Sequence, residues 1–232
     1  MARLDFWAKY LSEKHKYMDG QLKEAGPLIT ISRDHGCFGF HVTKHIISKI
    51  REITVDNVKN KEWTYLNKEI MTEAAEDLQT HPEQIDKMFA DSDKHSIGKF
   101  FDAMVKHTYA TDKQVLETVK QVINAQAWEG NVIIVGRSAA SITQRIEKSL
   151  HVKLVAPLEF RIRQVEKLKG ITYKEASTEV KEADKRRTQY LKKFSDHKTD
   201  IDLYDMTINT SRFSETAIAD MIVRIAQDKG LF

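Results

Sequence analysis

The sequence predicts an α/β fold, with a sheet of parallel strands between two layers of helices. Apolar or β-branched runs at 27–33, 63–66, 131–137 and 151–156 are typical of short strands, and a segment of helical periodicity follows each. A further strand is expected at 204–211. Strands that alternate with helices are joined by parallel crossovers, so their carboxyl ends meet at one edge of the sheet. Ligands of such folds bind at that edge.

The helices are predicted from apolar spacing and from their end signals. They are expected, in chain order, over 39–51, over 138–149, from about Pro157, over 172–194 and after Ser214. Pro157 costs little in a first turn, where its missing N–H has no partner to lose. Ser214 is expected to cap the last helix, with Glu215 in its first turn. Residues 4–24 and 82–129 also have helical patterns, with breaks.

Length and composition indicate one globular domain. The chain has 232 residues, of which 41% are hydrophobic and 31% charged, enough for a packed core. The net charge of +3 disfavours a nucleic-acid polymer as partner. The single cysteine cannot form an internal disulfide, so a cytoplasmic location fits best. No run of 18 apolar residues occurs, so no membrane segment is expected.

A turn with two glycines joins the first strand to the first helix, in the stretch ITISRDHGCFGFHVTKHI (29–46). Such a turn can cradle phosphate on backbone amides and a helix N-terminus. The P-loop pattern is G-x-x-x-x-G-K-[ST]. When it is aligned from Gly36, Gly36 and Thr43 match. His41 stands in place of the second glycine, and Val42 stands in place of the lysine. The backbone amides keep their affinity for anions, whereas the positive charge that a lysine would place beside the transferring phosphate is missing.

The sequence leaves open which cation replaces that lysine. The nearby candidates are Arg33, His35, His41 and Lys44. A plain strand-turn-helix, whose glycines merely permit positive φ, stays an equal alternative. Cys37 is interpreted as a small turn residue rather than a thiol nucleophile, because no base is identifiable beside it. The nine histidines form no ligand triad, so no zinc or haem site is predicted.

Arginines recur where later strands and helices meet. Arg137 follows the strand 131–137, and Arg161 lies early in the helix after the fourth strand. A guanidinium at either place could hold a phosphate through two hydrogen bonds. The helix that contains VKEADKRRTQYLKKF (180–194) could serve as a cationic lid. The alternatives are surface arginines and a solvated helix with acidic partners at neighbouring turns.

Six segments together resemble the cytidylate kinase-like family of P-loop proteins: ITISRDHGCFGFHVTKHI, WTYLNKEIMTEAAE, GNVIIVGRSAA, LHVKLVAPLEFRI, EADKRRTQYLKKF and LYDMTINTSRFS. The resemblance covers residues 27 to about 225. It implies a nucleoside monophosphate kinase fold with a five-stranded parallel sheet. It also implies the following parts of a single domain: a core at 27–66 and 130–232, a lid at about 160–200, a helical acceptor-binding insertion at 67–129 and an N-terminal helical extension at 1–26.

The activity that the resemblance implies is transfer of the γ-phosphate of Mg²⁺-bound ATP to CMP or dCMP. The implied donor-phosphate contacts are Arg33, Gly36, Cys37, Phe38, Gly39, Phe40, His41, Val42 and Thr43. Thr43 is also the expected Mg²⁺ ligand. The implied catalytic residues, which orient the acceptor or neutralise charge, are Arg137, Arg161, Asp184, Arg186 and Arg187.

Two departures from the family pattern keep other functions open. Val42 stands at the lysine position, and Phe40 replaces the arginine of the glycine-glycine-arginine found in looser relatives. The segment KEIMTE lacks the arginine that binds the acceptor phosphate. A catalytically silent nucleotide or anion sensor is therefore a second hypothesis. A structural domain that forms a homodimer through helices 82–129 is the third. The acceptor base, its sugar and the oligomeric state stay open.

Overall fold

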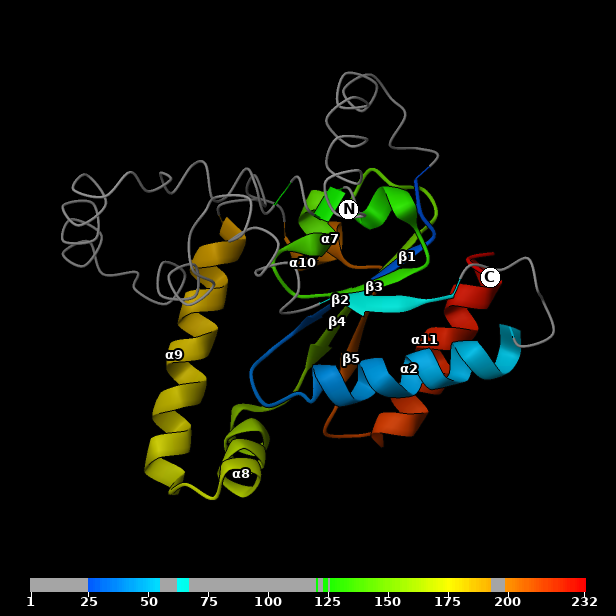
Figure 1. Cartoon of the computed structure of the whole chain (residues 1–232). Coiled ribbons are helices and arrows are strands. Elements are labelled where there is room, and N and C mark those ends of the chain that lie inside the picture. Colours follow the sequence, from blue (N-terminus) through cyan, green and yellow to red (C-terminus); the bar gives the residue numbers. More distant parts are fainter. Residues whose placement is uncertain (1–24, 55–61, 67–119, 121–122, 125, 193–198) are drawn as a thin grey trace, which may run out of the picture.

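The computed structural model describes residues 25–54, 62–66, 120, 123–124, 126–192 and 199–232 (Figure 1). The predicted N-terminal extension and nearly all of the insertion predicted at 67–129 lie outside these residues. The division into core, insertion, lid and extension therefore stays a prediction.

A sheet of five parallel strands forms the centre of the molecule (Figure 1). The strands are β1 (Leu28–Arg33), β2 (Thr64–Leu66), β3 (Val132–Val135), β4 (Ser149–Val155) and β5 (Met206–Asn209), in the order β2-β3-β1-β4-β5. In the central strand β1, Leu28 pairs with Val132 on one side and with Ser149 on the other. The predicted α/β fold with a five-stranded parallel sheet is confirmed.

Helices cover both faces of this sheet. They are α2 (Gly39–Thr54), α7 (Ala139–Ile142), α8 (Leu158–Lys169), α9 (Tyr173–Lys192), α10 (Asp200–Leu203) and α11 (Glu215–Asp228). Helices α2 and α11 pack against each other below the sheet in Figure 1, and α7 and α10 lie above it. The first four residues of β1 are all buried, as expected for a central parallel strand covered on both faces. Among the described residues, no helix is long and apolar enough to cross a bilayer.

Helices α8 and α9 form a hairpin beside the carboxyl ends of the strands (Figure 1). Pro157 is the N-cap of α8, and Gly170 ends the helix in the left-handed region at φ 64°. Ile162 and Val165 of α8 pack against two buried residues of α9 in a small core of their own. The hairpin falls within the lid predicted at about 160–200, and it presents α9 to the strand ends.

The helix predicted over 138–149 is wrong in its extent, because α7 ends at Ile142. Strand β4 begins at Ser149, which must lie opposite Leu28, so the chain turns back after one helical turn. The hydroxyl of Ser149 donates to the Ile146 carbonyl across that turn. Helix α10 was not predicted. The cap predicted at Ser214 is confirmed, since its hydroxyl accepts the Ala217 N–H at 3.2 Å.

Candidate active site

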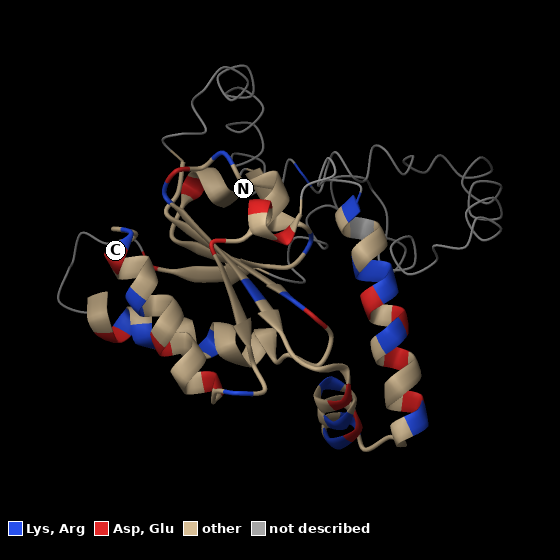
Figure 2. Cartoon of the chain, turned by 180° about the vertical axis from the view of Figure 1, so that it is seen from behind, with Lys and Arg blue, Asp and Glu red and all other residues tan. Residues whose placement is uncertain are grey.

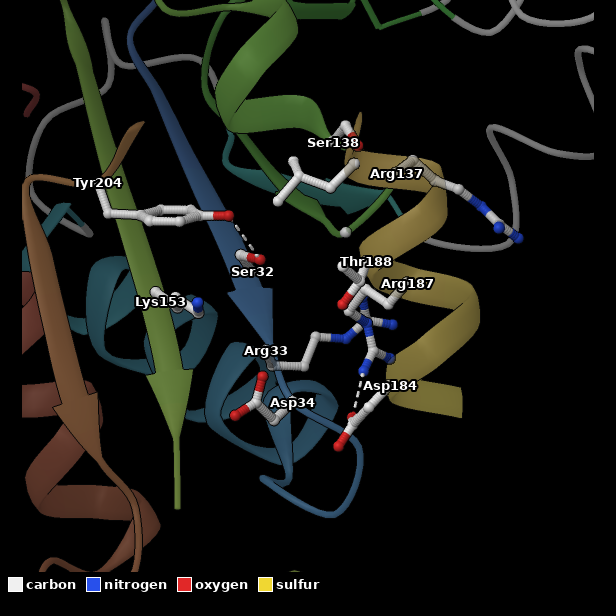
Figure 3. A pocket seen from close by; sticks show the side chains of 12 residues that line it. Ser32, Arg33, Asp34, Arg137, Ser138, Lys153, Asp184, Arg187, Thr188 and Tyr204 are labelled. Atoms are coloured by element: carbon white, nitrogen blue, oxygen red, sulfur yellow. Dashed lines mark hydrogen bonds and ion pairs between the residues drawn. The ribbon is translucent and has the colours of Figure 1, made fainter. Parts of the chain in front are cut away.

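Two cavities open where the carboxyl ends of β1, β3 and β4 approach α8 and α9, and Figure 3 shows the one that lies over the strand ends. The strand-end cavity, about 170 Å³, lies over the strand ends and contacts Ser32, Lys153 and Tyr204. The loop cavity, about 290 Å³, runs along the turn at 34–41 and the side of α8. Both cavities share three lining residues: Arg33, Asp34 and Arg187. These three side chains therefore stand between the two spaces.

The Arg33 side chain runs from the end of β1 across two glycines. A Cβ added to Gly39 would lie 3.0 Å from Arg33 Cγ, and one added to Gly136 would lie 2.1 Å from Arg33 Nη1. In the described part of the chain, no carboxylate comes within ion-pair distance of this guanidinium. Burial, with smaller repulsion from Arg187 and Arg137, lowers the pKa of Arg33 to about 9. The guanidinium stands in a cationic environment.

A second arginine is fully engaged at the contact between the turn and the hairpin, which we call the loop–lid junction (residues His35, Arg161, Glu179 and Asp184). Arg161 is 8% exposed. It donates to the Ala156 carbonyl at 3.0 Å and the His35 carbonyl at 3.3 Å, and it forms an ion pair with Asp184. The other Asp184 oxygen accepts the His35 N–H at 3.2 Å. Asp184 thereby fastens α9 to the turn.

The His35 ring adds a second link between the turn and α9. Its Nε2 lies 2.7 Å from Glu179 Oε1, and Lys169 donates to both oxygens of the same carboxylate at 2.8 Å. Burial lowers the pKa of His35, although the bond to Glu179 opposes that change. Burial also raises the pKa of Cys37 to about 11. Its thiol therefore stays protonated at neutral pH, which supports the interpretation as a turn residue.

The turn residues predicted to bind phosphate separate into two groups. Residues 36–41 line the loop cavity together with Arg33. Val42 and Thr43 line neither cavity: Val42 is 0% exposed in the main core, and the Thr43 hydroxyl is buried and donates to the Gly39 carbonyl at 2.7 Å. This position does not support Thr43 as a Mg²⁺ ligand.

The aromatic side chains of the turn pack on neighbours. Phe38 stacks on His41 with ring centroids 5.8 Å apart, and Phe40 lies edge-on to Tyr65 at 5.8 Å. The N–H groups of residues 39–41, at the start of α2, donate to no acceptor in the part of the chain that the structure covers. An open helix N-terminus of this kind attracts anions.

The predicted catalytic residues do not all reach the cavities. Arg137, Asp184 and Arg187 line the strand-end cavity. In Figure 3 the Arg137 guanidinium extends away from the strand ends, whereas the Arg187 guanidinium lies beside Arg33. Arg187 Nη1 is 3.5 Å from Asp184 Oδ1. Arg161 is buried in the loop–lid junction.

Arg186 lines neither cavity and pairs with Glu182 of its own helix at 3.5 Å. Basic and acidic residues alternate along the length of α9 (Figure 2). For Arg186, this placement matches the solvated-helix alternative.

Several polar residues of the strand-end cavity escaped the sequence reasoning. The Tyr204 hydroxyl donates to Ser32 Oγ at 3.0 Å, and Lys153 lies 5.6 Å above the Tyr204 ring and pairs with Asp200. Burial raises the pKa of Asp34, although nearby Arg161 opposes the shift. Ser32 and Lys153 are register partners near the ends of β1 and β4. Polar residues at the carboxyl ends of predicted parallel strands were the signal that could have found them.

The residues present suit Mg²⁺ carried by a nucleotide better than a resident metal. Among the described residues, no group of three or more His, Cys, Asp or Glu side chains could hold a metal ion. Kinases bind Mg²⁺ through one or two carboxylates and the substrate phosphates. Asp34 lines both cavities, and its carboxylate makes no hydrogen bond or ion pair within the described ranges. It is the carboxylate that fits this role.

Comparison with known proteins agrees with this geometry. Residues 28–212 match the cytidylate kinase-like family. The chain belongs to this family. It is 35% identical over 103 residues to the cytidylate kinase of Pyrococcus horikoshii. The matched region covers 44% of this chain and 52% of that protein. It is 36% identical over 98 residues to the cytidylate kinase of Methanopyrus kandleri, and this match covers 38% of this chain and 51% of that protein.

The chain spans about half the length of the curated relatives that it matches. A solved structure of an uncharacterized protein from Eubacterium ventriosum superposes with a TM-score of 0.60 at 19% identity. That similarity covers 86% of this chain and 98% of the other, and it shows a shared fold.

Proposed function

We propose that this protein binds nucleotides and transfers the γ-phosphate of ATP to a nucleoside monophosphate such as CMP or dCMP. The observation that carries the proposal is that the guanidinium groups of Arg33 and Arg187 lie side by side at the strand ends, in a cavity that Arg137 also lines. The two neighbouring guanidinium groups repel each other, and a multivalent anion between them would relieve the repulsion. Because the curated relatives are named cytidylate kinases, ATP and CMP are the first anions to test.

The two cavities suggest where donor and acceptor bind. The loop cavity contains the open amides at the start of α2, which suit the donor phosphates of ATP. The strand-end cavity contains Arg137, Lys153 and Tyr204, which suit the phosphate and polar groups of an acceptor. Because Arg33, Asp34 and Arg187 line both spaces, the transferred phosphoryl group would pass beside them.

The chemical step needs little from the protein beyond position and charge. An oxygen of the acceptor phosphate forms a bond to the γ-phosphorus, and the bond from that phosphorus to the β–γ bridging oxygen breaks. The electron pair of the broken bond leaves with ADP, so no proton transfer is required when the acceptor is a dianion. Arg187 and Arg33 would stabilise the charge on the transferring group. Mg²⁺ carried by ATP would supply further neutralisation, and Asp34 is the carboxylate that would hold it.

Arg161 and Asp184 have a positioning role in this proposal. Asp184 accepts from the His35 backbone and pairs with Arg161, which holds α9 against the turn. Their effect on catalysis would therefore pass through the position of Arg187. For Arg186, which faces Glu182, no contact with the substrates is proposed.

A coupled assay of ADP release tests the function. Wild-type protein with Mg²⁺-ATP should release ADP when CMP, dCMP or another nucleoside monophosphate of a panel is added. Arg137→Ala should lower that rate by about 100-fold while the protein stays folded. Arg163→Ala is the matched control, because Arg163 is exposed on α8 and paired with Glu159 and Glu166.

The sensor hypothesis remains the second candidate, and the observation that favours it is the absence of a lysine from the turn at 34–43. A sensor should show a thermal shift with ATP but release no ADP with any acceptor. A ligand at about 100 times its dissociation constant adds roughly 2.7 kcal/mol to the free energy of unfolding. Binding without turnover would decide for the sensor.

A further inference from the structure

The start of α2 changes the register in which the phosphate-binding turn is compared with the P-loop pattern. In that motif a strand leads into G-x-x-x-x-G-K-[ST], and the lysine stands where the helix opens. Here β1 ends at Arg33 and α2 opens at Gly39. A window that starts at Arg33 therefore puts Gly39 at the lysine position. The window from Gly36 instead puts Val42 there, inside the core.

The backbone supports this register independently. The window from Arg33 puts Phe38 at the second glycine of the motif. Phe38 has φ 52°, in the left-handed region that favours glycine. A bulky residue in this region retains the turn geometry that a glycine would normally provide. The loop thus keeps its path without the glycine and without the lysine.

The side chain of Arg33 fills the space beside the missing lysine. Its Cγ would lie 3.0 Å from a Cβ on Gly39, and its Nη1 reaches Gly136 at the end of β3. The side chain therefore crosses the mouth of the turn at the residue from which the lysine would extend. Gly136 has φ 82°, and any side chain there would collide with the guanidinium. Two glycines thus keep this path open.

Among the described residues the charge of Arg33 has no ion-pair partner, unlike that of Arg161. No acidic side chain in the described part of the chain forms an ion pair with it, although Asp34 and Asp184 also line the strand-end cavity. The charges that act most on Arg33 are those of Arg187 and Arg137, which repel it. Asp184, which is the nearest acid on α9 to line this cavity, already binds Arg161, Arg187 and the His35 N–H. An anion that bridges both cavities would be the natural counter-charge.

We propose that Arg33 is the cation that binds the transferring phosphate of ATP, in place of the lysine that opens the helix in other P-loop kinases. This inference rests on the proposed function, because it concerns the donor of the same reaction. Arg33 reaches the phosphate from the end of β1 rather than from α2. Since it lines both cavities, it can stay in contact with the phosphoryl group during transfer.

The inference is tested by moving the positive charge from Arg33 to the first residue of α2. Arg33→Ala should lower kcat/KM for Mg²⁺-ATP by about 100-fold or more. Gly39→Lys alone should also impair the protein, because its new side chain meets Arg33 at the Cβ. The double variant Arg33→Ala/Gly39→Lys removes that collision and restores a cation, and it should regain at least about 10-fold of the lost activity. Arg163→Ala again serves as the control of equal charge.

The outcomes separate this inference from the proposed function. If wild type releases ADP and Arg33→Ala is equally active, the inference is wrong and the proposed function stands. If wild type binds ATP without turnover, the proposed function fails, and the dissociation constant for ATP then tests the role of Arg33. A rise of about 10-fold in this constant in Arg33→Ala supports the inference, and an unchanged constant overturns it. If wild type does not bind ATP, both are overturned. Thermal melts of each variant show whether lost activity reflects unfolding.

Discussion

Arg161 and Arg33 both contact the turn at 34–41, yet they differ in the partners that their charges find. In the loop–lid junction, Arg161 donates to two carbonyls and pairs with Asp184. In the strand-end cavity, Arg33 forms no ion pair with a described residue, and Arg187 and Arg137 repel it. A buried charge whose partners are all present contributes to the fold. A buried charge that has no such partners is available to a ligand. The difference in partners therefore distinguishes an arginine that stabilises the fold from one that binds a ligand.

The largest expected effect is on stability, and it should divide the two arginines. Arg161→Ala leaves the Asp184 carboxylate and the His35 carbonyl without their partner, so we expect a loss of about 3–5 kcal/mol in the free energy of unfolding. Arg33→Ala removes a repelled cation and should change that free energy by less than about 1 kcal/mol. Urea denaturation of both variants without nucleotide measures the difference.

Equal losses for the two variants would contradict this division. Arg161→Met is a useful control, because it keeps an apolar side chain of similar length while removing the charge. It should still lose most of the stability that Arg161→Ala loses. Recovery in Arg161→Met would assign the effect to packing rather than to the hydrogen bonds and the ion pair.

The second prediction extends the comparison to a buried group whose charged form is disfavoured by burial. His151 in β4 accepts or donates at 2.8 Å from Thr30 Oγ1 and at 3.2 Å from Ser149 Oγ. Burial is the main cause that lowers the pKa of His151 to about 4. Between pH 6.5 and 4 the unfolded chain binds a proton that the folded chain does not, so stability falls as the pH falls. The total loss should be about 3 kcal/mol.

Urea denaturation at several pH values measures this loss. Other groups also titrate in this range, so the comparison is with His151→Gln, which cannot take up the proton. The variant should be less stable at pH 7 but should lose less stability between pH 6.5 and 4. Parallel curves for wild type and variant would show that His151 does not carry the pH dependence.

The fold was readable from the sequence where local pattern decides it. The run from Leu28 to Ile31 is apolar or β-branched throughout, which is typical of a central parallel strand, and it forms one. The end of α7 at Ile142 was not readable. It depends on Ser149 pairing with Leu28, a contact between residues far apart in the chain. Local helix propensity favoured a longer helix, and the register of the sheet overrode it.

The site was predictable in its parts but not in its assembly. The sequence identified Arg33, Arg137 and Arg187 as candidates, and it placed the turn after the first strand. It did not reveal that the Arg33 side chain passes over Gly39 to reach Gly136, because that contact joins β1 to β3 across the sheet edge. The first glycine of the turn, Gly36, is also not the residue at which the P-loop pattern begins in the structure. The helix start at Gly39, which the sequence predicted and the structure confirms, favours a different window.

The smallest of the three effects concerns how closely the turn approaches the hairpin. Gly36 has φ 89°, and a Cβ there would lie 2.7 Å from the Arg161 carbonyl oxygen. Gly36→Ala therefore combines backbone strain with a collision against backbone, and we expect a loss of about 2 kcal/mol. Gly170→Ala is the matched control, because Gly170 also has positive φ, at 64°, but nothing lies within 4 Å of its Cβ position. It should lose about 1 kcal/mol from strain alone.

The difference between these two glycine variants isolates the contact between the turn and Arg161. If both lose the same free energy in urea denaturation, the turn can move away from α8 without cost, and the loop–lid junction is looser than its hydrogen bonds imply. If Gly36→Ala loses more, the junction is rigid, and the variant should also weaken ATP binding, since the same turn lines the loop cavity. Gly170 lines neither cavity, so its variant should leave ATP affinity unchanged.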